Sequence, residues 1–216
     1  MNYALIYNDQ IKVGPRDWNY YFFLDWLEEN NQDFSQLPRA EPGIAVITDS
    51  WKLLPVTEII YPEVQEPFEQ LVGPFWTIQE KSITGLYTKI NQKIDTIRGR
   101  LKETVAANRY AVEVGKLEYT FSDGETVELF TEREERAIYF QTLSILPNDQ
   151  TVPFKFKGGK IRPAVTKAEL GEIVALGTTH IRNVFEWESQ KATEIDSAST
   201  IEDLKVIELR HPSQIS

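Results

Sequence analysis

The chain contains no cysteine, and that absence removes several kinds of chemistry. Disulfides, thiolate nucleophiles, iron–sulfur clusters and cysteine-ligated zinc are all excluded. Only two histidines are present, His180 and His211, and neither has a second histidine four residues away, so no histidine metal site is indicated. We therefore expect no metal and no other cofactor, and we expect His180 to pack or to form a hydrogen bond on a helix face.

Long apolar runs are also missing. No stretch approaches the roughly 20 apolar residues that cross a bilayer. The apolar start Met1–Tyr7 is interrupted by Asn8-Asp9 and has neither the basic leader nor the cleavage site of a signal peptide. The sequence therefore predicts a protein that is made in the cytoplasm and does not insert into a membrane.

Basic residues are scarce. The formal net charge is -10 and the isoelectric point is near 4.8. Nucleic-acid binding needs clustered Lys and Arg that displace counterions from phosphates, so a nucleic-acid partner is not expected. The acidity is uneven: residues 1–90 hold 13 acidic and 6 basic side chains, whereas residues 91–216 hold 20 and 17. The first part carries most of the negative charge.

The first 90 residues are rich in aromatics and prolines. Tyr3–Tyr7 and Ile11–Val13, separated by Asn8-Asp9-Gln10, predict a hairpin. Asp17–Asn30 predicts a helix with Asp17 as its N-cap, apolar on nearly every side. The prolines that follow exclude central positions in a sheet and predict only edge strands or extended connections. These predicted strands are Ile44–Thr48, Val56–Tyr61 and Phe75–Gln79.

The pattern changes near Ile90. Asn91–Val114 predicts a long amphipathic helix with one apolar stripe formed by Ile90, Ile94, Ile97, Leu101 and Val105. The stripe ends at Asn108-Arg109, before a coiled-coil repeat is established. We therefore favour packing on the chain's own helices, those that begin at Thr131 or Thr166, over a symmetric coiled coil.

Turns and helix caps organise the rest of the chain. Hairpins are predicted around Ser122–Glu125 and Gly158-Gly159, and capped helices after Thr131, Thr166 and Thr200. The whole sequence thus predicts an α+β protein. Its first part, residues 1–90, is a strand- and proline-rich module with one aromatic helix, and its second part, residues 91–216, is a helix–hairpin–helix–hairpin–helix domain.

Catalytic patterns are weak. Gly158-Gly159-Lys160 lacks the spacing of a phosphate-binding loop and reads as a hairpin turn. The carboxylate pairs lie side by side on helices and point about 100° apart, so they do not converge on one substrate bond. Helix starts and solvated faces account for them. The pairs are Glu28-Glu29, Glu134-Glu135 and Glu202-Asp203.

The most unusual segment is the aromatic run from Trp18 to Leu27. Two interpretations stay open: a helix buried in the core, or an anchor for a partner subunit, because Trp, Tyr and Phe dominate interface hot spots. A carbohydrate platform is a third interpretation, which lacks convergent polar groups. The predicted interface residues are Trp18, Tyr21, Phe22, Trp26 and Trp76.

Short motifs of helix caps and turns are spread over the second half of the chain. They are Arg109, Asp123-Gly124, Thr131-x-Arg133-Glu134-x-Arg136, Val165–Leu170, His180-Ile181 and Ala198–Leu204. On these motifs the second half, from Asn91 to Leu209, resembles a small domain of unknown function that recurs in phage tail, tail-fibre and fibre-assembly proteins. The segment Gly73–Glu103 also resembles the connector that precedes this domain in phage tail proteins.

This resemblance implies a virion context. With no catalytic pattern found, we expect a non-catalytic adaptor of the virion tail that is assembled in the host cytoplasm and links tail fibre to baseplate as part of an oligomeric assembly. The alternative is a tail-fibre assembly chaperone that is absent from the finished particle.

Overall fold

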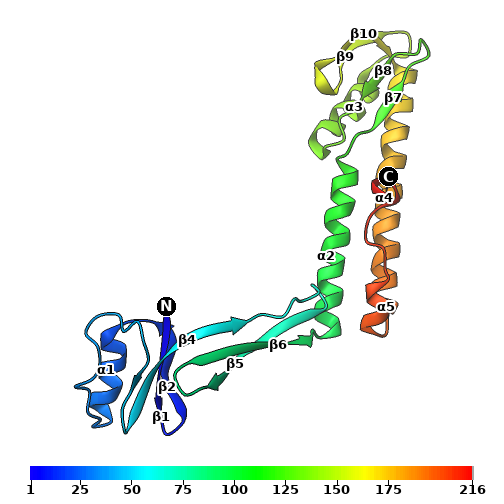
Figure 1. Ribbon diagram of the computed structural model, residues 1–216. Coiled ribbons are helices and arrows are strands. Elements are labelled where there is room, and N and C mark those ends of the chain that lie inside the picture. Colours follow the sequence, from blue (N-terminus) through cyan, green and yellow to red (C-terminus); the bar gives the residue numbers. More distant parts are fainter. Residues whose placement is uncertain (216) are drawn as a thin grey trace. The chain divides into compact units, whose positions relative to one another are not determined.

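The computed structural model describes residues 1–215 (Figure 1). Helices make up 40% and strands 29% of the protein, which makes it α+β as expected. The chain divides into two compact units between Gln92 and Lys93, two residues beyond the change of composition noted above. Each unit has its own buried apolar residues and is described by itself.

The first unit begins with a two-stranded hairpin. β1 (Asn2–Tyr7) pairs antiparallel with β2 (Gln10–Asp17). The two residues between the strands, Asn8 and Asp9, have φ of 51° and 53°. Two positive φ values are what a tight type I′ hairpin turn requires, and Asn and Asp tolerate them. The predicted hairpin is confirmed, although its second strand runs four residues further than expected.

One six-stranded sheet occupies most of this unit. Its order is β2-β1-β4-β6-β5, and β3 (Val46–Ile47) pairs with β4. The other strands are β4 (Trp51–Ile60), β5 (Glu69–Ile78) and β6 (Ile83–Asn91). The prediction that the prolines leave no central strand is wrong, because β4 is central and contains Pro55. Pro55 is the last residue in register with β1 and Val56 is the first in register with β6, so the proline falls where the ladder changes partner.

The strands at the two ends of this order, β2 and β5, are each interrupted by a Gly-Pro pair. Gly14-Pro15 lies in β2 and Gly73-Pro74 in β5, and the register shifts at both places. The φ of Gly14 is +84° and that of Gly73 is +133°. Proline has no N–H to offer and the shifted backbone no longer matches a straight strand. These edges are therefore poor templates for the addition of another strand.

The aromatic helix α1 (Tyr20–Glu29) begins later than predicted. Its N-cap is Asn19, whose side chain accepts a hydrogen bond from the Tyr21 backbone N–H, while Asp17 is the last residue of β2. The predicted cap is thus corrected by two residues, because the hairpin extends to Asp17. Phe23 and Leu27 point inward and are fully buried against β1 and β4.

Two long helices run side by side in the second unit (Figure 1). They are α2 (Ile94–Glu113) and α4 (Lys167–Ser197). The predicted start of α2 is wrong, because β6 continues to Asn91 and Ile90 is a half-exposed strand residue. The stripe formed by Ile97, Leu101 and Val105 is buried. Of the two helices predicted to cover this stripe, those that begin at Thr131 or Thr166, it is the second, α4, that packs along α2.

Two short hairpins and one helix lie between α2 and α4 in the sequence. β7 (Glu118–Thr120) pairs with β8 (Thr126–Glu128), and β9 (Thr151–Lys155) pairs with β10 (Ile161–Thr166), so both predicted hairpins are confirmed. Between them lies α3 (Arg133–Ile145). Capping boxes begin α4 and α5 (Ile201–Lys205), as the sequence predicts, although α5 ends four residues early. Short 3-10 turns occupy Lys157–Gly159 and Pro212–Gln214.

The cap predicted at Thr131 is wrong. The N-cap of α3 is Glu132, and no side chain caps the helix. Thr131 is buried, and its hydroxyl instead donates a hydrogen bond of 3.1 Å to the backbone oxygen of Gly115. The hydroxyl therefore gives a hydrogen-bond donor to the backbone oxygen just beyond α2. This contact helps to hold the start of α3 against the end of α2.

No helix within residues 1–215 has both the length and the hydropathy of a membrane span.

Candidate functional site

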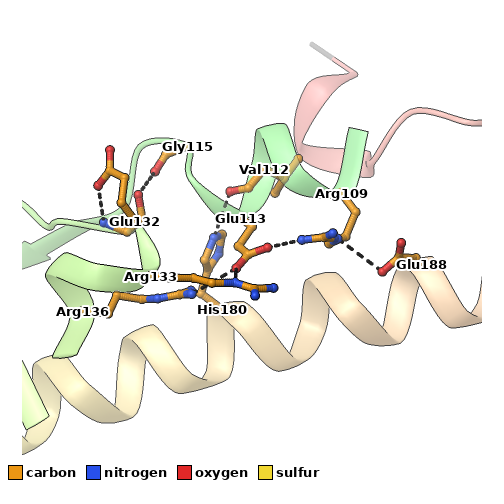
Figure 2. A network of polar contacts seen from close by, with 10 residues as sticks. Arg109, Val112, Glu113, Gly115, Glu132, Arg133, Arg136, His180 and Glu188 are labelled. Atoms are coloured by element: carbon orange, nitrogen blue, oxygen red, sulfur yellow. Dashed lines mark hydrogen bonds and ion pairs between the residues drawn. The ribbon is translucent and has the colours of Figure 1, made fainter. Parts of the chain in front are cut away.

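A fully buried carboxylate, that of Glu113, lies at the end of α2. Three arginines surround it (Figure 2). Arg109, one turn earlier on α2, forms a close ion pair with Glu113. From α3, Arg136 Nη2 lies 3.0 Å from Glu113 Oε1 and Arg133 Nε lies 3.6 Å from the same oxygen. The carboxylate thus joins the last turn of α2 to the first turn of α3.

Arg109 also contacts a third helix, α4. Its Nε lies 3.2 Å from Glu188 Oε2 on α4, and its guanidinium carbon lies 4.8 Å from the centre of the Phe185 ring. Arg109 therefore bridges the buried Glu113 and the half-exposed Glu188. One network of charges holds α2, α3 and α4 together.

The charge state of Glu113 follows from competing effects. Burial of the carboxyl raises its pKa, but the hydrogen bond from Arg136 and the charges of Arg109, Arg136 and Arg133 outweigh burial, and the pKa is lowered overall. Glu113 is therefore ionised at neutral pH. Its oxygens are occupied by guanidinium groups, so it is poorly placed to transfer a proton to a substrate.

The network continues to the backbone at the end of α2. The Nε2 atom of His180, on α4, lies 3.0 Å from the backbone oxygen of Val112. A carbonyl oxygen only accepts, so this ring nitrogen carries the proton and donates. The Val112 oxygen also accepts a hydrogen bond of 3.1 Å from the Gly115 backbone N–H, so His180 adds a second donor at this helix end. The prediction that His180 forms a hydrogen bond on a helix face is confirmed.

Arg133 and Arg136 occupy an unusual place. They lie in the first turn of α3, where the helix dipole favours anions and not cations. Glu134 and Glu135, in the same turn, suit the dipole. Arg133 and Arg136 are three residues apart, so they lie on the same face of the helix. The buried Glu113 faces both of them and stabilises their charges at this end. The ion pairs of Glu113 with Arg109, Arg133 and Arg136 have a structural role. They fix the angle between α3 and the paired helices α2 and α4.

A cavity of about 410 Å³ adjoins the cluster between α3 and α4. Its floor is apolar and includes Leu129, Tyr139 and Ile173, all of them buried. Its polar lining consists of Thr131, Thr178, Arg133, Arg136 and His180. This size lies in the range of ligand-binding pockets and of the pockets that receive single anchor side chains of a partner.

The five predicted interface residues all lie in the first unit, in different surroundings. Trp18 stacks on Phe23 with ring centres 5.2 Å apart, and Trp26 lies 5.5 Å from Tyr7, so both are partly buried in the core. Trp76 packs beside Gly85 in the neighbouring apolar cluster.

Tyr21 and Phe22 differ from the tryptophans. They are adjacent on the outer side of α1, and 69% and 47% of their surfaces are exposed. The Arg16 guanidinium lies 4.6 Å from the centre of the Phe22 ring. The structure therefore separates the predicted set into three tryptophans that pack inside the unit and two rings that face outward.

The remaining candidates from the sequence do not converge. His211 accepts a hydrogen bond from the Ser213 backbone N–H and packs its ring on Trp187, about two turns along α4 from His180. Within residues 1–215 no group of three or more His, Asp or Glu side chains is arranged to hold a metal ion. Gly158 and Gly159 form the turn between β9 and β10, with φ of +73° and +81°, as predicted.

Comparisons with protein-family models, with curated proteins and with solved structures found no match for this chain.

The role of Glu113 was missed by the sequence reasoning. A signal was present, because the apolar stripe of α2 continues from Val105 to positions 109 and 113, where an Arg and a Glu four residues apart form a favourable pair. Two charges on the buried side of a helix indicate partners elsewhere. Arg133 and Arg136 of α3 are those partners of Glu113.

Proposed function

We propose that this protein is a non-catalytic structural adaptor of a bacteriophage tail, which joins tail components such as fibre and baseplate. The resemblance of the second unit to a phage tail domain supports the virion context. One observation carries the adaptor role: each of the two compact units has its own core and its own outward-facing apolar feature. Two such features allow two partners to be held by one chain.

In the first unit that feature is the outer side of α1. Phe23 and Leu27 fill the core, so Tyr21 and Phe22 are left over. Large exposed aromatic rings side by side are typical of interface anchors. The interrupted edges β2 and β5 disfavour strand addition, which leaves side-chain contacts as the mode of binding.

In the second unit the feature is the cavity between α3 and α4. Its walls belong to elements that the buried Glu113 network fixes in place. A preformed cavity costs little ordering free energy when a partner binds, and preformed pockets are where anchor side chains of a partner lodge.

Mass spectrometry of purified particles tests this role. An adaptor is expected at a fixed copy number relative to the other tail proteins. A tail-fibre assembly chaperone, the alternative, is expected in infected cells and absent from particles. Absence from particles would overturn the adaptor proposal in favour of the chaperone.

A pair of variants extends the same test to the outer side of α1. Phe22→Ala removes an exposed ring and is expected to lower the copy number in particles without unfolding the unit. Asp25→Ala, at another exposed position of α1, is the matched control and is expected to leave incorporation unchanged. Equal incorporation of both variants would show that this side of α1 binds no tail protein.

A further inference from the structure

The cavity between α3 and α4 combines an apolar interior with a lining whose charged groups are all cationic. No Asp or Glu is among the residues that line it, and the acidic first-turn residues Glu134 and Glu135 lie outside it. The interior accepts an apolar group. The cationic lining favours an anion beside that group.

The charge network leaves this lining positive. Glu113 and Glu188 are two carboxylates that face the three guanidinium groups of Arg109, Arg133 and Arg136. Arg109 forms ion pairs with both Glu188 and Glu113. The loosest partner is Arg133, whose side chain is 72% exposed and whose Nε is 3.6 Å from Glu113.

Arg136 adds a second sign of incomplete pairing. One of its terminal nitrogens, Nη2, donates to Glu113 at 3.0 Å, whereas Nη1 is buried and has no hydrogen-bond partner. A buried N–H without a partner costs free energy, and such groups are uncommon in folded proteins. Arg133 therefore leaves excess positive charge at the cavity wall, and Arg136 leaves one N–H donor unused.

We propose that the cavity binds a segment of a partner protein in which a bulky apolar residue is followed by Asp or Glu. The apolar side chain fills the interior and the carboxylate pairs with Arg133 at the rim. This inference rests on the proposed adaptor role only in taking the occupant to be a protein, and it names the chemistry of one partner.

Two capped peptides test it on the full chain. Ac-Ser-Phe-Glu-Ser-NH2 and Ac-Ser-Phe-Gln-Ser-NH2 differ only in the carboxylate. Each is titrated into ¹⁵N-labelled protein, and amide shifts are followed at Ile173, Val174 and Ile181, which line the cavity. Both peptides are expected to shift these signals, and the Glu peptide is expected to bind about three-fold more tightly, as for one exposed ion pair.

A glycine pair supplies the blocking variant and its control. Gly177 lines the cavity, and a Cβ built there meets no atom within 4 Å, so a side chain can begin there and Gly177→Leu is expected to occupy cavity space. Gly171, in the same helix, also has open space and does not line the cavity. Gly177→Leu is expected to abolish peptide binding, and Gly171→Leu is expected to retain it.

Arg133→Gln tests the charge separately. It is expected to remove the preference for the Glu peptide and to leave binding of the Gln peptide unchanged. Because the side chain of Arg133 is exposed, its replacement is expected to leave the fold intact, and an unchanged circular dichroism spectrum checks this.

Several outcomes overturn the proposal: no shift with either peptide, shifts that persist in Gly177→Leu, or equal binding of the two peptides by the wild-type chain. A wild-type dimer that Gly177→Leu converts to a monomer in sedimentation would assign the cavity to a second copy of the chain instead. These measurements use purified protein, so they fail or succeed independently of whether the chain is found in particles.

Discussion

The two units solve the problem of a stable interior in different ways. In the first unit the interior is made of rings and aliphatic side chains, and even the polar atoms of large residues find backbone partners, as the Trp51 indole N–H does with Asp33 at 2.6 Å. The second unit also has an apolar core, but in addition it takes a carboxylate fully inside and matches it with arginines from two helices. The comparison shows that one chain can fix its helices by packing in one place and by charge in another.

The same difference determines which side chains of each unit are left at its surface for a partner to contact. The first has more aromatic rings than its core holds, so Tyr21 and Phe22 remain outside. The second has more guanidinium groups than carboxylates at its junction, so positive charge remains at the cavity rim. An apolar surplus suits contacts of broad specificity, whereas a charge surplus beside a pocket selects among partners.

The largest effect is expected from Leu101→Lys. Leu101 is buried between α2 and α4, and an unpaired ammonium group there costs at least about 4 kcal/mol. The circular dichroism of the helices should fall. Tryptophan fluorescence should change little, because four of the five tryptophans lie in residues 1–92. Glu103→Lys, at an exposed position of α2, is the control.

A folded Leu101→Lys chain would contradict the account. If that variant kept its helices and only lost self-association, the stripe of α2 would be a seam between copies of the chain rather than the inside of one unit.

A neighbouring pair of residues on α1 sharpens the comparison within the first unit. Phe23→Ala is expected to destabilise it by about 3–5 kcal/mol, because Phe23 is fully buried. Phe22→Ala is expected to change stability by only about 0.5 kcal/mol, because the ring is half exposed. Urea unfolding followed by tryptophan fluorescence measures both. Similar losses for the two variants would mean that the outer ring also supports the fold.

The sequence predicts the second unit better than the first. Thr166-x-x-Glu169, Asp123-Gly124 and Gly158-Gly159 act through neighbours in the chain, so local chemistry predicts their helix starts and turns. The central position of β4 was not predictable in the same way. Whether Pro55 is tolerated depends on which strands lie on either side of it, and that information is not local.

The same distinction between local and distant contacts explains which features of the site the sequence could predict. The aromatic run identifies a helix, but only the depth of each ring separates Phe23 from Phe22. Glu113 acquires its role from Arg136, 23 residues later in the chain, and from Arg109, which also pairs with Glu188, 79 residues beyond it. Spacing within a helix indicates the Arg109–Glu113 pair and cannot indicate the others.

The smallest effects are expected at the helix caps. Thr166→Ala removes the capping box of α4 and Asn19→Ala removes the cap of α1, each at a cost of about 1 kcal/mol. Urea unfolding should detect the first by circular dichroism of the helices and the second by tryptophan fluorescence. Each loss should be confined to its own unit. A loss from Thr166→Ala that appears equally in the fluorescence of the first unit would show that the two units unfold together.

The claim that charge fixes the second unit is tested most directly by unfolding wild type and Glu113→Gln in urea across a range of pH. The folded pKa of Glu113 is lowered from 4.5, so its stabilising contribution is present above about pH 4.5 and is lost as the pH falls through the folded pKa. Near pH 7 the variant is expected to be less stable by about 3–5 kcal/mol, because its arginines lose their buried partner. This difference should narrow as the pH falls through the folded pKa and the wild-type carboxyl is protonated. A difference that stays the same at every pH, or no difference near pH 7, would contradict the account.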